Sequence, residues 1–149
     1  MKKSYFLIIL LFAGLLLAVE SEPSEIVGYV KYEMVAGNNL IAIPMTSEWM
    51  WASELGDSFN GLVDQISYWD YSSQSFITAA DLGGFWDGDF EIDEGMALLL
   101  NSSAVTNFYS SGDLPADAVY QVNVGNNTIM IPLNRNDLSW ASEVGSEMG

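Results

Sequence analysis

A repeated block constrains the fold of this chain more than any other feature of its sequence. The segment Tyr32–Pro44 returns as Tyr120–Pro132, an offset of 88 residues, and both carry a Gly-Asn-Asn triplet followed by Ile-x-Ile-Pro. A second block, Trp51–Gly56, returns as Trp140–Gly145 at an offset of 89 residues. Two blocks in the same order at nearly one spacing indicate tandem copies of a single structural unit.

The repeat divides the 149 residues into four parts. Residues 1–18 are a predicted signal peptide, residues 19–26 an acidic linker, residues 27–115 a complete β-rich module, and residues 116–149 a truncated second copy. The second copy lacks a counterpart to everything that follows Gly61 in the first. Because so short a segment cannot close its own core, we expect the intact protein to continue.

The N-terminus has the three parts of a secretory signal peptide. Lys2 and Lys3 form the positive start, residues 5–18 are almost wholly apolar, and an acidic stretch follows. Cleavage is expected after Ala18, although Leu16 is larger than the residue preferred three positions before a cleavage site. The apolar run is shorter than the roughly 20 residues that span a bilayer, so membrane contact is expected only if this segment stays uncleaved. The pattern predicts a secreted or cell-surface protein.

Alternating apolar residues and turn signals predict mainly short strands. The first predicted hairpin joins Val27–Val35 to Leu40–Ile43 through the Gly-Asn-Asn turn, and the second copy repeats it over residues 120–131. Another hairpin is predicted over residues 63–79, with Tyr71-Ser72-Ser73 as its turn. Further strands are expected at Met96–Leu100 and Val105–Tyr109, with a turn over residues 110–113.

One short helix is predicted in each copy. In the first it covers Glu48–Leu55, capped by Thr46 or Ser47 and ended by Gly56. In the second copy Asp137 is the expected cap. Trp51 and Leu55 lie four residues apart, as do Trp140 and Val144, which favours core positions for both tryptophans. The chain is therefore predicted to be all-β, a small β-barrel or sandwich with one short helix per repeat.

The segment Tyr32–Pro44 resembles the start of the "GWNLISIP"-type repeat. Ile66–Asp70 is similar to a later Trp-Asp strand of that family, and Phe90–Met96 resembles its Gly-containing turn and strand. Asn38 and Asn126 replace the usual tryptophan. The resemblance implies a tandem module of large secreted or cell-surface bacterial proteins, and it implies no catalytic residues.

Composition excludes several functions. Four basic residues stand against 20 acidic ones, a balance that repels nucleic acids and anionic lipids. The absence of cysteine removes disulfides and thiol chemistry, and the absence of histidine removes the commonest general base and transition-metal ligand. No set of residues stands out as catalytic, so we expect a protein that is not an enzyme.

Two candidate sites remain. Asp87, Asp89, Glu91 and Asp93 are candidate Ca²⁺ ligands, because hard cations prefer clustered carboxylates, although their spacing does not fit an EF-hand. Trp86, in a Gly-flanked loop, is the aromatic residue expected to be most exposed for stacking on a sugar, whereas Trp69 is expected to face the core. No other cofactor is expected.

These patterns favour a non-enzymatic extracellular repeat module with a spacer, adhesion or interaction role, whose partner would be a glycan or protein at the cell surface. The alternative is a carbohydrate-binding module of a secreted hydrolase.

Overall fold

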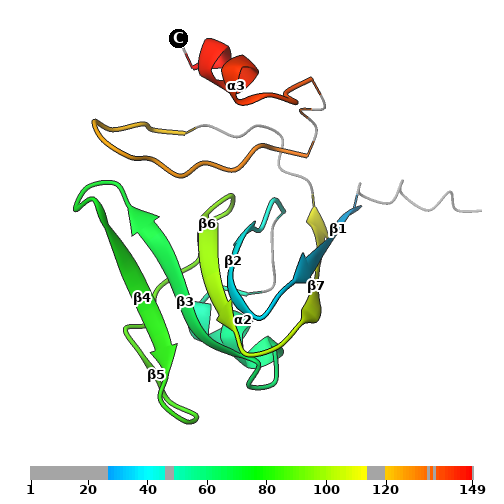
Figure 1. Ribbon diagram of the computed structural model, residues 1–149, viewed down its shortest axis with the longest axis vertical. Helices are drawn as coiled ribbons and strands as arrows, with labels where there is room; N and C mark the ends of the chain where they lie inside the picture. The colour runs from blue at the N-terminus through cyan, green and yellow to red at the C-terminus, as the bar shows by residue number, and fades with distance from the viewer. Residues whose placement is uncertain (1–26, 46–48, 114–119, 134, 136, 149) are drawn as a thin grey trace, which may run out of the picture.

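The structure is a computed structural model that describes residues 27–45, 49–113, 120–133, 135 and 137–148 (Figure 1). The predicted signal peptide and linker therefore lie outside the described residues. The elements, labelled as in Figure 1, are β1 (Val27–Met34), β2 (Gly37–Ala42), α2 (Ala52–Ser58), β3 (Val63–Asp70), β4 (Ser75–Asp81), β5 (Trp86–Asp87), β6 (Ala97–Ser102), β7 (Thr106–Asp113) and α3 (Ala141–Glu147). No helix among them is long and apolar enough to cross a membrane.

The strands form two antiparallel sheets. One is the pair β1–β7, and the other has five strands in the order β2-β6-β3-β4-β5 (Figure 1). The prediction of a mostly β chain is confirmed.

The predicted hairpin between β1 and β2 is wrong. β1 pairs along its whole length with β7, whereas β2 pairs with β6. Gly37 has a φ of 97°, a left-handed conformation that glycine adopts at little cost, and Asn39 hydrogen-bonds both the amide and the carbonyl of Val35. The Gly-Asn-Asn triplet therefore turns the chain from one sheet into the other. For the same reason residues 110–113, predicted to be a turn, are strand residues paired with β1.

The predicted hairpin over residues 63–79 is confirmed. β3 and β4 pair in register from Gln65↔Ala80 to Asp70↔Ser75, and the connecting residues form a tight turn. The carboxylate of Asp70 accepts hydrogen bonds from the backbone amides of Ser72 and Ser73, an arrangement that stabilises short turns. The strand predicted at Met96–Leu100 is β6, shifted by one or two residues.

Both sheets and helix α2 share one hydrophobic core. Its fully buried members include Ile66 and Leu98 of the larger sheet, Met34 of β1, and Leu55 of α2. Phe108 of β7 joins the smaller sheet to the same core. One face of each sheet therefore points inward, as the period-two pattern of apolar residues predicted.

Helix α2 begins and ends later than predicted. Thr46 and Ser47, the predicted caps, lie outside the described residues, and the residue at the N-cap is Trp51. Glu54 accepts hydrogen bonds from the backbone amides of Met50 and Trp51, which come just before the first turn. The free amides of Ala52 and Ser53 in that turn donate to the Phe90 carbonyl and the Asp89 carboxylate. The helix runs through Gly56 and ends at Ser58 with Phe59 as its C-cap, and Asn60 then takes a left-handed φ of 54°.

The expectation that Trp51 and Trp140 are core residues is also wrong. They stand at the N-caps of α2 and α3 with 38% and 72% of their surface exposed. In α2 the buried face is made by Ala52, Leu55 and Gly56, the spacing of one helical stripe.

The second copy reproduces local structure without sheet pairing. Residues 120–133 run as extended chain beside the first copy but form no strand, so the hairpin predicted there is wrong (Figure 1). In the first copy the equivalent strands pair with β6 and β7, and the described residues 120–148 contain no equivalent of either. Asp137, the predicted cap of α3, is instead bound by the guanidinium of Arg135.

Candidate functional site

The four candidate Ca²⁺ ligands have separate structural surroundings. Asp87 is in β5, Asp89 accepts hydrogen bonds from the amide and hydroxyl of Ser53 at the start of α2, and Glu91 bridges to Trp51 through the backbone. Asp93 closes a turn through its carbonyl. Within the part of the chain that the structure describes, no three acidic side chains are grouped so as to hold a metal ion.

Trp86 is packed against helix α2 and is only partly exposed. Its indole N–H donates to the carboxylate of Asp57 at 2.8 Å, and its ring lies directly over Gly56. A ring held in this way has one face covered by protein, so Trp86 is less available for stacking on a sugar than the sequence indicated.

Trp69 faces away from the core, contrary to expectation. Its ring meets that of Phe76, its cross-strand neighbour, edge to face at 5.1 Å, and Phe76 is half exposed. Trp69 follows Tyr68, which packs against the core, and successive strand residues point to opposite faces.

A groove of about 590 Å³ lies between the first copy and residues 120–128 of the second. Five aromatic residues of the first copy line it, namely Trp51, Tyr68, Trp69, Tyr71 and Phe90. The side chains of Trp51 and Tyr71 are 38% and 44% exposed, and Tyr68 is held by an edge-on contact with Phe90 at 4.8 Å. Tyr120 adds an aromatic ring from the second copy. We call this site the aromatic–acidic groove.

Carboxylates line the same groove. Glu91, Asp93 and Glu94 follow one another closely in the loop before β6, and Asp70 ends β3. Hydrogen bonds from Ser73, and from the amide and hydroxyl of Ser72, lower the pKa of Asp70 to about 2. The groove is therefore strongly negative at neutral pH.

The pKa values of two tyrosines in the groove are raised, in part by this negative charge. Burial raises the pKa of Tyr68, and the carboxylates of Asp70 and Asp93 raise it further. Burial likewise raises the pKa of Tyr120, with a further contribution from Glu94. Both phenols therefore stay protonated and keep a hydrogen to donate.

The hydroxyl of Tyr120 is buried and has no hydrogen-bond partner among the described residues. In the first copy the equivalent Tyr32 donates its hydroxyl hydrogen to the carbonyl of Ala42. Tyr120 instead lies against Gly95 at the edge of the groove. A buried hydroxyl without a partner is costly, and the equivalent tyrosine of the first copy does not bear this cost.

A second contact joins the two copies beside the groove. The indole N–H of Trp69 donates to the carbonyl of Asn126 at 2.8 Å, and the side-chain amide of Gln74 donates to the same carbonyl at 3.1 Å. The amide of Asn126 donates back to the Gln74 side-chain oxygen at 2.8 Å. Residues near the tip of the β3–β4 hairpin thus hydrogen-bond to Asn126 in the Gly-Asn-Asn turn of the second copy. We call this contact, made by Trp69, Gln74 and Asn126, the module junction.

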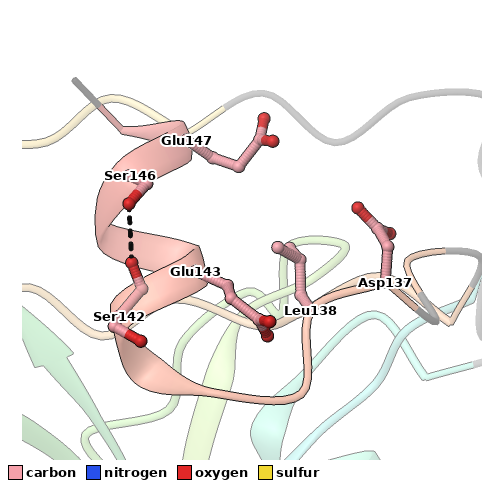
Figure 2. A pocket seen from close by; sticks show the side chains of 6 residues that line it. All are labelled: Asp137, Leu138, Ser142, Glu143, Ser146 and Glu147. Carbon is pink, nitrogen blue, oxygen red and sulfur yellow. Dashed lines mark hydrogen bonds between the residues drawn. The ribbon is translucent and has the colours of Figure 1, made fainter.

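A further hollow of about 340 Å³ lies along helix α3, lined by Asp137, Glu143, Glu147 and three neighbours (Figure 2). Its carboxylates already have protein partners. Arg135 binds Asp137 and approaches Glu147 at 3.5 Å, while Glu143 accepts from the amides at the helix start. This hollow therefore offers little free charge to a ligand.

Sequence reasoning missed most of the groove. The sequence pattern places Trp51 in the core and Tyr71 in a turn, and Glu94 is not among the predicted ligands. The available signal was the position of Trp51 directly before Ala-Ser-Glu, since a residue at an N-cap projects from the helix end instead of joining its buried stripe.

Comparisons of the chain with models of protein families, with curated proteins and with solved structures give no match.

Proposed function

We propose that the chain is a non-enzymatic repeat module of a secreted or cell-surface bacterial protein, with a spacer, adhesion or interaction role. In this proposal the complete module is a small β-barrel or sandwich, and each copy carries one short helix, α2 in the first copy and α3 in the second. The signal-like N-terminus supports secretion, and the likeness to the "GWNLISIP"-type repeat supports a tandem arrangement.

One observation carries the proposal: equivalent side chains in the two copies make the same hydrogen bonds to the backbone. The side-chain oxygen of Asn39 accepts a hydrogen bond from the amide of Val35 at 2.8 Å, and that of Asn127 accepts one from the amide of Asn123 at 2.9 Å. The side-chain NH₂ of each asparagine donates to the carbonyl of the same partner, Val35 or Asn123.

The beginnings of the two helices are also equivalent. The carboxylate of Glu54 accepts hydrogen bonds from the amides of Met50 and Trp51. The carboxylate of Glu143 accepts hydrogen bonds from the amides of Ser139 and Trp140. Equivalent residues thus make equivalent bonds in both copies, which supports a repeated structural unit.

The module junction indicates how such units would be held in an array. Because Trp69 and Gln74 make three hydrogen bonds with one residue of the next copy, they limit the rotation of consecutive copies. A spacer or adhesion protein needs such an orientation to keep its binding surfaces regularly placed.

The experiment removes the junction from the full chain. Trp69→Phe combined with Gln74→Ala deletes all three hydrogen bonds, and we expect amide exchange at Asn126 to rise about fivefold. Trp86→Phe serves as the control, because it deletes an indole hydrogen bond within the first copy only. Unchanged exchange at Asn126, or an equal rise in the control, would show that the copies are not held by this contact.

A further inference from the structure

The geometry points to a cation site: we propose that the aromatic–acidic groove binds an arginine or lysine side chain presented by a basic segment of a partner protein. This inference deepens the interaction role proposed above and rests on it, because both copies line the groove.

Charge is the first argument. The side chains of Glu91, Asp93 and Glu94 take part in none of the hydrogen bonds or ion pairs found among the described residues. The basic residues of that same part of the chain, Lys31 and Arg135, are paired with acids elsewhere. The chain carries a net charge of −16, and the residues that the structure describes supply no cation to this groove. A cation from a partner would neutralise these carboxylates, and charge-assisted bonds to them are the strong kind.

The aromatic rings are the second argument. Trp51 and Tyr71 present large exposed aromatic surfaces within the groove that holds the carboxylates. A guanidinium or ammonium group over such a ring is attracted by its negative face, most strongly when the ring is an indole. Carboxylates beside exposed rings therefore favour a cation over a neutral ligand.

The number of carboxylates is the third argument. Glu91, Asp93 and Glu94 all line the groove from one short segment before β6. A guanidinium carries five N–H donors in a rigid fork, enough to bond more than one carboxylate oxygen at once, whereas an ammonium is a compact point charge. Arginine therefore fits the groove better than lysine.

A neutral oligosaccharide is the main competitor for the same rings. Sugar hydroxyls are both donors and acceptors, so a sugar site needs both kinds of partner. The groove offers both kinds of partner, because its tyrosine hydroxyls can donate and its four carboxylates accept. A neutral sugar would leave the negative charge of these carboxylates uncompensated, whereas a guanidinium neutralises it, and this difference favours the cation.

The test measures binding of fluorescein-labelled hexaarginine to the full chain by fluorescence anisotropy at roughly 150 mM salt, where exposed charges act over only about 8 Å. Hexacitrulline, which keeps the shape and lacks the charge, is the control peptide. We expect hexaarginine to bind, hexalysine to bind more weakly, and hexacitrulline not to bind.

The chain offers matched control variants. Trp51→Ala should weaken hexaarginine binding about tenfold, whereas Trp140→Ala, the equivalent change outside the groove, should leave it unchanged. Trp51→Phe keeps a ring and should retain most of the affinity, which guards against a simple folding defect.

Charge variants separate the site from general attraction. Asp93→Asn with Glu94→Gln should lower affinity about tenfold more than Asp64→Asn with Asp87→Asn, which removes equal charge from exposed positions outside the groove.

Equal losses in the paired variants would overturn the proposal, since attraction would then be general. So would binding of neutral oligosaccharides that is lost in Trp51→Ala, in the absence of hexaarginine binding. If hexaarginine fails to bind while the Asn126 amide remains protected by the module junction, the cation site is refuted and the repeat array stands.

Discussion

Gly56 is the position where the structure makes its sharpest stability prediction. It lies inside helix α2, and a Cβ added there would stand 2.1 and 2.2 Å from two ring carbons of Trp86. Carbon atoms in contact are normally about 3.5–4.0 Å apart, so the indole would have to move by more than an ångström. That movement breaks its hydrogen bond to Asp57.

The size of the effect follows from three contributions. Overpacking costs about 1–3 kcal/mol, and the lost hydrogen bond costs about 1 kcal/mol more. Replacing glycine by alanine inside a helix stabilises the helix by about 1 kcal/mol. Gly56→Ala should therefore lower the free energy of unfolding by about 2 kcal/mol, which corresponds to about 8–16 °C in Tm for a domain of this size.

Gly145 provides the matched control, because it is the equivalent glycine of helix α3 and has open space where its Cβ would be. Gly145→Ala should leave Tm unchanged or raise it slightly. Urea unfolding followed by circular dichroism measures both, and Trp86→Ala should abolish the penalty of Gly56→Ala in a double-mutant cycle. If Gly56→Ala is as stable as the wild-type chain, the packing of Trp86 on α2 described above is incorrect.

Two further predictions concern turns. Because the pKa of Asp70 is depressed to about 2, its stabilising contribution is present above its unfolded pKa of about 4 and is lost as pH falls towards 2. The Tm deficit of Asp70→Ala should therefore be largest at neutral pH and shrink below about pH 4, and a deficit independent of pH would contradict this assignment. Asn39→Ala removes three hydrogen bonds at the corner between the sheets and should cost about 1–2 kcal/mol in urea unfolding. Asn127→Ala deletes the same bonds in the second copy and should leave unfolding of the first copy unchanged, so equal losses would argue against a corner role for Asn39.

The sequence predicted local structure well and long-range pairing poorly. The hairpin around Tyr71–Ser73 was found because its strands are adjacent and its turn is short. The Gly37–Asn39 turn gave the same kind of signal, yet it joins strands of different sheets. A turn motif specifies how the backbone bends locally, whereas the partner of each strand depends on β6 and β7, more than 50 residues away.

The candidate site was less predictable, because it depends on exposure. Trp51 and Trp86 are both tryptophans near glycines or helix ends, and periodicity alone cannot tell which is covered. The absence of a side chain at Gly56 decides the matter by letting the Trp86 ring lie on the helix. Trp51, at the N-cap, is left partly open to solvent.

The position of the groove between consecutive copies has a consequence for longer arrays. If every junction forms a groove of this kind, a chain of n modules carries n − 1 of them at fixed separation. Weak binding at each groove would then add up to a higher overall affinity. Sites joined on one scaffold bind a partner of matching spacing about 10²–10⁴-fold more tightly than a single site does. A basic partner with regularly spaced arginines would be held by a long array and released by a single pair of modules, so array length itself would set the selectivity.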